Sequence, residues 1–231
     1  AAPSHSSSTD QEQADAQAAL IKAPPSYVPV MGPMVTLYPL SCIKKRTKGK
    51  QFEKDRSVAS RFARQEQLFY TEGVRKTVDA ILLVHDHGHP HVLMLHIDHK
   101  FWKLPGGKMK ANETELECLK RKLDQRLAPE PSSGLPAPDW KIVELAGVFY
   151  RPNFEASMFP YQVPHVTETK EIKKLFVVTI TGECVFEFPA NYGIELVSLM
   201  DLLDNSKRFG PVASSIPLLL SRFQFVCLDH E

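Results

Sequence analysis

One stretch of this chain has residue types that could do phosphate chemistry. It consists of a glycine pair followed by a charged amphipathic helix. Residues 106–128 read GGKMKANETELECLKRKLDQRLA. Carboxylates clustered on such a helix can hold Mg²⁺ against the phosphates of a nucleotide. Leucines recur at helical spacing, which predicts a helix over 113–127 with Asn112 as its N-cap and Glu115 three residues on. The leucines of this apolar face are Leu116, Leu119, Leu123 and Leu127.

The spacing in this stretch resembles a Nudix box, which reads G-x5-E-x7-R-E-U-x-E-E-x-G-U, with U aliphatic. The matching positions are held by Gly107, Glu113, Arg121 and Leu123. The three positions that should be Glu are Lys122, Gln125 and Arg126, and the last glycine is Ala128. Two cations and an amide repel a metal ion instead of binding it. We therefore expect the scaffold without the hydrolase: no catalytic residue, no metal and no cofactor.

Composition and length suit one globular domain with an extension. The 231 residues carry a formal net charge of +1, so bulk positive charge does not attract nucleic acid, and any such binding needs a compact site. The four cysteines lie far apart without a CxxC pair, which argues against a zinc site and for a reducing compartment. No apolar run is long enough for a membrane span, and the N-terminus lacks a signal-peptide core.

Hydrophobic periodicity predicts strands mixed with a few helices, and hence α+β or an α/β/α sandwich. Strands are expected over 34–40, 74–84, 92–97, 140–150, 175–180 and 184–188. Helices are expected over 55–70, 194–203 and 212–223, with a basic loop at 44–50 that is best explained as a solvated turn. The predicted organisation is a flexible tail (1–34), a strand and helix extension (35–73), a degenerate Nudix domain (74–203) and a C-terminal helical extension (204–231).

Two other clusters of reactive side chains are weaker candidates. The run His85-Asp-His-Gly-His-Pro-His91 could bring imidazoles to a metal, but Gly88 and Pro90 predict a turn that splays them. No carboxylate or thiolate completes a ligand set, so we expect solvated turn histidines. Cys118 lies beside the leucine face, where a buried thiol is commonly inert.

Two segments could contact a base. In Lys100-Phe-Trp-Lys-Leu-Pro-Gly-Gly107, neighbouring strand residues point to opposite faces, so one of Phe101 and Trp102 can be core while the other stands in a cleft. The plainer alternative is that both are core. Glu53 precedes a helix that carries Arg61, and these types can read base edges. The alternative there is ordinary charge at a helix start, paired with a nearby Arg.

Longer strings resemble a specific family, the small Nudix-fold subunit of pre-mRNA cleavage factor Im. The resemblance covers 35–226 and is far more specific than the box alone. The strings are LYPL (37–40), EKDRSVASRF (53–62), VRKTVDAILLVHDHGHPHVLML (74–95), FWKLPGG (101–107), RPNFE (151–155), YQVPHVTETKEIKKLF (161–176) and DNSKRFGPVASSIPLLLSRFQF (204–225).

The resemblance implies a non-hydrolytic homodimer in the nucleus that binds single-stranded RNA containing UGUA. It also implies a larger RRM-containing subunit and other 3′-end processing factors as partners, and no membrane. The RNA-binding residues that carry over are Glu53, Arg61, Asp79, Lys100, Phe101, Trp102, Leu104, Phe209 and Gly210.

Several of these positions depart from the family. Asp79 stands for a Glu near the first uridine, Lys100 for Thr, Trp102 for Phe and Phe209 for Tyr. A shortened carboxylate and a lost hydroxyl put single base contacts in doubt, but not the stacking platform. The alternatives are a Nudix hydrolase of dinucleoside polyphosphates with unusual metal ligands, and a sensor that binds such a molecule without cutting it.

Overall fold

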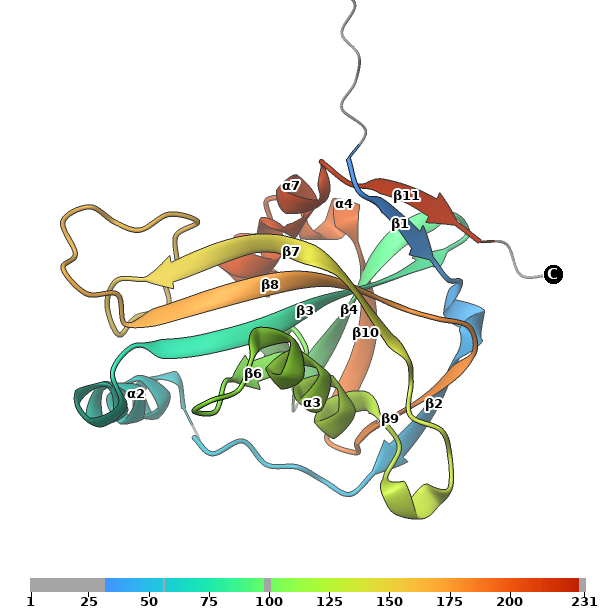
Figure 1. The fold of residues 1–231 in the computed structure, drawn as a ribbon, viewed down its shortest axis with the longest axis horizontal. Helices are drawn as coiled ribbons and strands as arrows, with labels where there is room; N and C mark the ends of the chain where they lie inside the picture. Colours follow the sequence, from blue (N-terminus) through green and yellow to red (C-terminus); the bar gives the residue numbers. More distant parts are fainter. Residues whose placement is uncertain (1–31, 56, 98–100, 229–231) are drawn as a thin grey trace, which may run out of the picture. The chain divides into compact units, whose positions relative to one another are not determined.

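A computed structural model describes residues 32–55, 57–97 and 101–228. Its centre is a twisted mixed sheet in the order β10–β4–β3–β8–β7 (Figure 1). The strands are β3 (Arg75–Asp86), β4 (His89–Ile97), β7 (Trp140–Arg151), β8 (Glu171–Ile180) and β10 (Tyr192–Ser198). β3 and β8 run parallel, and the other neighbours on this path are antiparallel. Long apolar runs in β3 and β8 match their burial on both faces.

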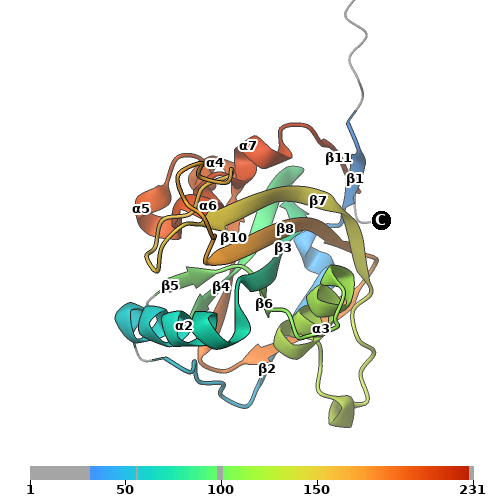
Figure 2. The same cartoon turned by 60° about the vertical axis from the view of Figure 1, so that its left-hand side comes forward.

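The sheet is covered on both faces, and the alternation of residues along β3 shows how. Val78 and Ala80 pack with α3 (Glu115–Leu127) in one core cluster. Ile81 and Leu83 pack with the C-terminal helices in a second cluster. Those helices are α4 (Leu199–Leu202), α5 (Ser206–Phe209), α6 (Pro211–Ser214) and α7 (Ile216–Leu220), and they lie on the opposite side of the sheet from α3 (Figure 2). The predicted α/β/α sandwich is confirmed.

Two short ribbons flank the sheet. β1 (Met34–Leu37) pairs in parallel with β11 (Gln224–Cys227), so the first and last described elements lie side by side. β2 (Ile43–Lys48) pairs in parallel with β9 (Cys184–Pro189). Single-turn 3₁₀ helices stand at Leu40–Cys42 and Pro131–Ser133. α2 (Val58–Glu72) begins at a Ser57–Ser60 capping box and ends at Gly73, as predicted to within a few residues.

A pair of very short strands fills the fork where β3 and β4 separate. The β3–β4 ladder covers only Leu83–Asp86, because beyond it β5 (Phe101–Lys103) pairs with β4 and β6 (Gly106–Lys108) pairs with β3. At Gly106 the chain passes so close to β3 that an added Cβ would lie 2.2 Å from the Val78 carbonyl oxygen. Only glycine fits this approach.

Several sequence-based predictions of secondary structure are wrong. Residues 192–198 form strand β10, because Tyr192, Ile194 and Val197 are buried on an edge of the sheet, and only 199–202 are helical. The predicted helix over 212–223 is split into α6 and α7, with Pro211 and Pro217 each placed in a first turn. The basic segment 44–50 is mostly strand β2; its side chains are exposed, but its backbone pairs with β9.

The cap of α3 also differs from the prediction. Thr114, not Asn112, is the N-cap, and its side chain and that of Glu117 form a reciprocal capping box. Asn112 lies outside the helix with a positive φ of 59°. Leu116 is 49 % exposed, so the buried face consists of Cys118, Leu119, Leu123 and Leu127.

Candidate functional site

The strand β5 divides the predicted aromatic pair between two faces of the molecule. Phe101 and Lys103 alternate with Trp102, so they share one face while Trp102 takes the other. Phe101 is 40 % exposed, whereas Trp102 is partly buried against the cluster of the C-terminal helices. The alternative that both are core is therefore wrong, with Phe101 as the exposed member of the pair, and its place in a cleft stays a prediction.

A polar cluster surrounds the carboxylate of Glu53. The Tyr192 hydroxyl donates to Glu53 Oε1 at 2.9 Å, and Lys103 Nζ lies 3.4 Å from the same oxygen. Arg126 Nη2 lies 3.6 Å from it, and Arg126 Nη1 donates to Tyr192 at 2.6 Å and to Gln51 Oε1 at 3.1 Å. Three elements that are distant in sequence, β5, α3 and β10, thus converge on one carboxylate. Asp55, not Glu53, forms the helix-start ion pair, with Arg64 at 2.5 Å.

Electrostatics keep Glu53 ionised. Burial alone would raise the pKa of Glu53, but Lys103, the Tyr192 hydroxyl and Arg126 together lower it below its ordinary value. Burial raises the pKa of Tyr192 to about 12, so this hydroxyl stays protonated and available as a donor. The cluster therefore presents a charged acceptor at neutral pH.

Trp102 is the centre of an aromatic cluster on the other face of β5. Its ring stacks on His96 across the β4–β5 ladder, with centroids 4.3 Å apart and planes within 7°. Phe209 meets it edge-on at 5.1 Å, and the Arg208 guanidinium lies 5.4 Å from the Trp102 centroid. Phe209 itself is 6 % exposed. Trp102 and Phe209 are thus brought together, but as a largely packed unit.

Asp79 and Arg61 lie near the Glu53 cluster, since Asp79 acts electrostatically on Lys103 and Glu53 acts on Arg61. Asp79 is buried in β3 beside Gly106 and forms an ion pair with Lys173. Arg61 lies in the first turns of α2, with its guanidinium 5.2 Å from the Phe62 ring centroid. Burial, followed by the nearby charge of Arg151, lowers the pKa of Arg61. Among the described residues no hydrogen-bond partner reaches its buried Nε, so this guanidinium keeps an unused donor.

The remaining predicted residues are placed less favourably. The Leu104 side chain is 5 % exposed and belongs to the second core cluster, so it contributes packing there. Gly210 caps α5 with a φ of 84° and has open space where a Cβ would stand. Lys100 falls outside the described residues.

The helix α3 holds its box residues in a charge-inverted arrangement. The Glu113 carboxylate forms a bidentate ion pair with Arg121, with Nε–Oε1 at 2.5 Å and Nη2–Oε2 at 2.7 Å. The Lys122 side chain crosses Gly107, whose Cβ would lie 3.0 Å from Lys122 Cε, and Lys122 donates to Gln125. Cations therefore stand over the glycine turn. Within the described residues no group of three His, Cys, Asp or Glu could hold a metal ion.

The other sequence candidates have structural roles. His85 was predicted to be a solvated turn residue, which is wrong: it is 4 % exposed, and its Nε2 lies 2.8 Å from the Leu228 carbonyl oxygen. The turn is confined to 87–88, with His87 almost fully exposed. Burial raises the pKa of Cys118 to about 11, which agrees with an inert thiol.

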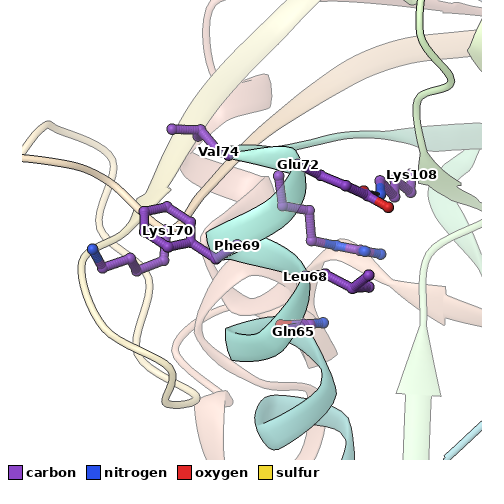
Figure 3. Close-up of a pocket in the computed structure, with 9 residues that line it drawn as sticks. Gln65, Leu68, Phe69, Glu72, Val74, Lys108 and Lys170 are labelled. Atoms are coloured by element: carbon purple, nitrogen blue, oxygen red, sulfur yellow. Dashed lines mark hydrogen bonds and ion pairs between the residues drawn. The ribbon is translucent and has the colours of Figure 1, made fainter.

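A hollow at the far end of α2 is separate from this site. It is lined by Leu68, Phe69 and Glu72 of α2, by Lys108 of β6 and by Lys170 of the loop that precedes β8 (Figure 3). Glu72 pairs with Lys108, and Lys170 lies 4.1 Å from the Phe69 centroid. None of the predicted site residues lines it. In the described part of the chain no helix has the length and apolarity to cross a membrane.

Sequence reasoning missed three residues that organise the site. Lys103 could have been found, because it shares a strand face with Phe101. Arg126 was interpreted only as a cation that repels metal, and Tyr192 was placed just before a predicted helix. Their convergence depends on the pairing of β10 with β4, which carries Tyr192 to Ile97. No local sequence signal specifies that pairing.

The chain is similar to known proteins in sequence and in fold. The family model described as nucleotide hydrolase, of the Nudix class, matches residues 33–223. The cleavage and polyadenylation specificity factor subunit 5 of Dictyostelium discoideum is 44 % identical over 85 % of this chain and 98 % of its own length. Subunit 2 of the 25 kDa pre-mRNA cleavage factor Im of Arabidopsis thaliana is 45 % identical over 84 % and 96 %. Among solved structures, a C. elegans Ap4A hydrolase in a binary complex has a TM-score of 0.44 at 12 % identity, over 64 % of this chain and 96 % of that one.

Proposed function

The chain belongs to the family of cleavage and polyadenylation specificity factor subunit 5, the 25 kDa subunit of pre-mRNA cleavage factor Im, and from this premise we propose that it binds single-stranded RNA containing UGUA. Binding serves pre-mRNA 3′-end cleavage and polyadenylation and involves no hydrolysis of nucleotides. The observation that carries the proposal is the ionised Glu53 on the same side of β5 as the exposed Phe101 ring. Such a pair offers a stacking surface and an acceptor for a base edge.

Each remaining candidate has a role that its surroundings support. The unused Nε donor of Arg61 can serve an acceptor of a base or phosphate. Asp79, Trp102, Leu104, Phe209 and Gly210 line the RNA path in this proposal, and Lys100, outside the described residues, is included on the family resemblance alone. In this proposal Leu104 contacts RNA through its backbone, since its side chain is buried. Trp102 and Phe209 contribute through their ring edges, because His96 stacks on the Trp102 ring and Phe209 is 6 % exposed.

The absence of hydrolysis rests on the charge of α3. A Nudix site needs carboxylates to hold Mg²⁺, and here Lys122 and Arg126 occupy carboxylate positions while Glu113 is held by Arg121. Cations over the glycine turn oppose a divalent metal ion. The same Lys122 ammonium over Gly107 favours the second candidate, a sensor that binds a dinucleoside polyphosphate without cutting it.

The proposal includes a homodimer in the nucleus, bound to a larger RRM-containing subunit and other 3′-end processing factors. The apolar segment 216–226, IPLLLSRFQFV, offers little free surface for a dimer. Ile216, Leu220 and Phe223 are buried in the chain's own core, which leaves Leu218 and Val226 exposed. A more promising surface is α2, which has no buried residue and exposes Val58 and Tyr70.

Fluorescence anisotropy with labelled RNA tests the function directly. The protein should bind a UGUA-containing single strand more tightly than the same strand with the G replaced by A. A parallel assay with a dinucleoside polyphosphate and Mg²⁺ or Mn²⁺ should show no turnover. Equal binding of both RNAs would contradict the proposal. Tight nucleotide binding without turnover that excludes RNA would favour the sensor.

A further inference from the structure

The helix that supplies metal ligands in a Nudix site has a different use in this chain. We propose that Arg126, together with Tyr192, is a positioning residue that holds the Glu53 carboxylate in one orientation for reading guanine. The inference rests on the proposed function, and it names how the same site obtains its specificity. Arg126 stands at a carboxylate position of the box, so a metal-binding position has become an anchor for a base-reading group.

The contacts of Arg126 support anchoring. Its side chain is only 12 % exposed, and its guanidinium lies 5.4 Å from the Tyr192 ring centroid. Nη1 is shared between the Tyr192 hydroxyl and Gln51 Oε1, and the Gln51 backbone is held on both sides by Asn191. Arg126 therefore links α3 to the segment that carries Glu53 and to β10. A planar guanidinium fixes such a junction better than a flexible ammonium.

Among the described residues, the side chains that contact Glu53 all approach the same carboxylate oxygen. Tyr192, Lys103 and Arg126 approach Oε1 at 2.9, 3.4 and 3.6 Å. With Oε1 fixed by three groups, Oε2 is the atom left to accept from a base. Guanine offers two adjacent N–H donors on its pairing edge, whereas adenine has an acceptor at one of these positions. A fixed acceptor therefore distinguishes the two bases more sharply than a mobile one.

Arg126 is poorly explained as a stabilising residue. In the described part of the chain its buried Nε has no hydrogen-bond partner, and an unsatisfied buried donor costs free energy. Replacing a whole buried ion pair with apolar side chains is often tolerated, whereas replacing Arg126 alone leaves the Glu53 charge with one partner fewer. The charged side chain is thus better explained by its effect on Glu53 than by its effect on the fold.

The first test measures base discrimination. Arg126→Ile should reduce the preference for UGUA over UAUA about tenfold, chiefly by weakening UGUA binding, and Tyr192→Phe should act in the same direction. Lys122→Leu is the matched control, because it removes a cation of the same helix that, within the described part of the chain, forms no hydrogen bond or ion pair with Glu53. It should leave the ratio unchanged. Arg126→Lys should keep part of the preference for UGUA, because it retains the positive charge but lacks the planar guanidinium.

A second readout does not involve RNA. The charged groups that act on Glu53 come from β5 (Lys103), α3 (Arg126) and α2 (Arg61), and Tyr192 of β10 donates to it. A ¹³C NMR titration of the Glu53 carboxyl should show a higher pKa in Arg126→Ile, and an unchanged one in Lys122→Leu.

The two readouts separate the two hypotheses. If the wild type does not discriminate UGUA from UAUA, the proposed function fails, and a shifted titration still shows that Arg126 positions Glu53. If Arg126→Ile weakens both RNAs equally and leaves the Glu53 titration unchanged, Arg126 is only a general positive charge, and the inference is overturned.

Discussion

Arg121 grips both carboxylate oxygens of Glu113, at 2.5 and 2.7 Å, in a bidentate ion pair at the start of α3. The Lys110 amide adds a third hydrogen bond to Glu113. The one glutamate that survives from the Nudix box is therefore fully engaged within the protein. In this structure Glu113 anchors the loop that leads into the helix.

On the proposed non-hydrolytic function, Glu113→Gln should leave the response of the protein to phosphate substrates unchanged, because Arg121 and Lys110 already occupy the Glu113 carboxylate. An assay with a dinucleoside polyphosphate and Mn²⁺ should give the same background rate for wild type and variant. Robust turnover by pure wild-type protein that disappears in Glu113→Gln would reverse this prediction, and with it the non-enzymatic assignment.

The same ion pair predicts a pH dependence of stability. The hydrogen bonds from Arg121 and Lys110 lower the pKa of Glu113 to about 2, from an ordinary 4.5. A lowered folded-state pKa contributes stability that is complete above pH 4.5 and is lost as the pH falls toward 2. Urea unfolding across this window should show a smaller fall in the free energy of unfolding for Glu113→Gln than for wild type. Glu168→Gln, in an exposed loop, is the control, and an equal fall in all three proteins would contradict the prediction.

The corrected N-cap of α3 gives a further prediction. Thr114→Ala removes the side chain that accepts from the Glu117 amide, and should lower the free energy of unfolding by about 1 kcal/mol. Asn112→Gly should change it much less, because Asn112 has a positive φ that glycine adopts freely. Chemical denaturation of both variants measures this. A larger loss in the Asn112 variant would restore the cap that the sequence had indicated.

The sequence predicted the buried central elements of this fold better than the strands that lie at the edge of the sheet or beside it. The apolar runs of β3 and β8 and the leucine spacing of α3 specify buried elements whatever their neighbours. Residues 192–198 and 44–48 were misassigned because their strand state comes from pairing with β4 and β9, which lie far away in sequence. The candidate site divides in the same way. Phe101 and Glu53 were found from local strings, whereas Lys103, Arg126 and Tyr192 became visible only when those pairings brought them to Glu53.

The salt dependence of RNA binding should be shallow for a nucleic-acid binder. The net charge is +1, and the site offers few cations that are not already paired, so few phosphates can be neutralised. Single strands lose affinity with a log–log slope of about −0.7 per phosphate contact. Anisotropy titrations between low and physiological salt measure the slope. A value that corresponds to six or more contacts would show that an exposed basic surface, such as Lys44, Lys45 and Arg46 of β2, dominates binding.

Replacing Phe101 with alanine and replacing Glu53 with alanine should change RNA binding in different ways. Phe101 is an exposed ring, and stacking does not depend on which base is stacked, so Phe101→Ala should cost about 1–3 kcal/mol for UGUA and UAUA alike.

Glu53 is an ionised acceptor held by Tyr192 and Lys103, and its loss leaves the guanine donors unpaired, which penalises UGUA but not UAUA. Glu53→Ala should therefore flatten discrimination at the G. Asp55→Ala, which removes the nearby carboxylate that pairs with Arg64, is the control and should preserve discrimination. If filter binding shows that Glu53→Ala weakens both RNAs equally, the carboxylate only organises the charges around β5. The reading of guanine must then come from another group at the site, of which Arg61, with its unused buried donor, is the first to test.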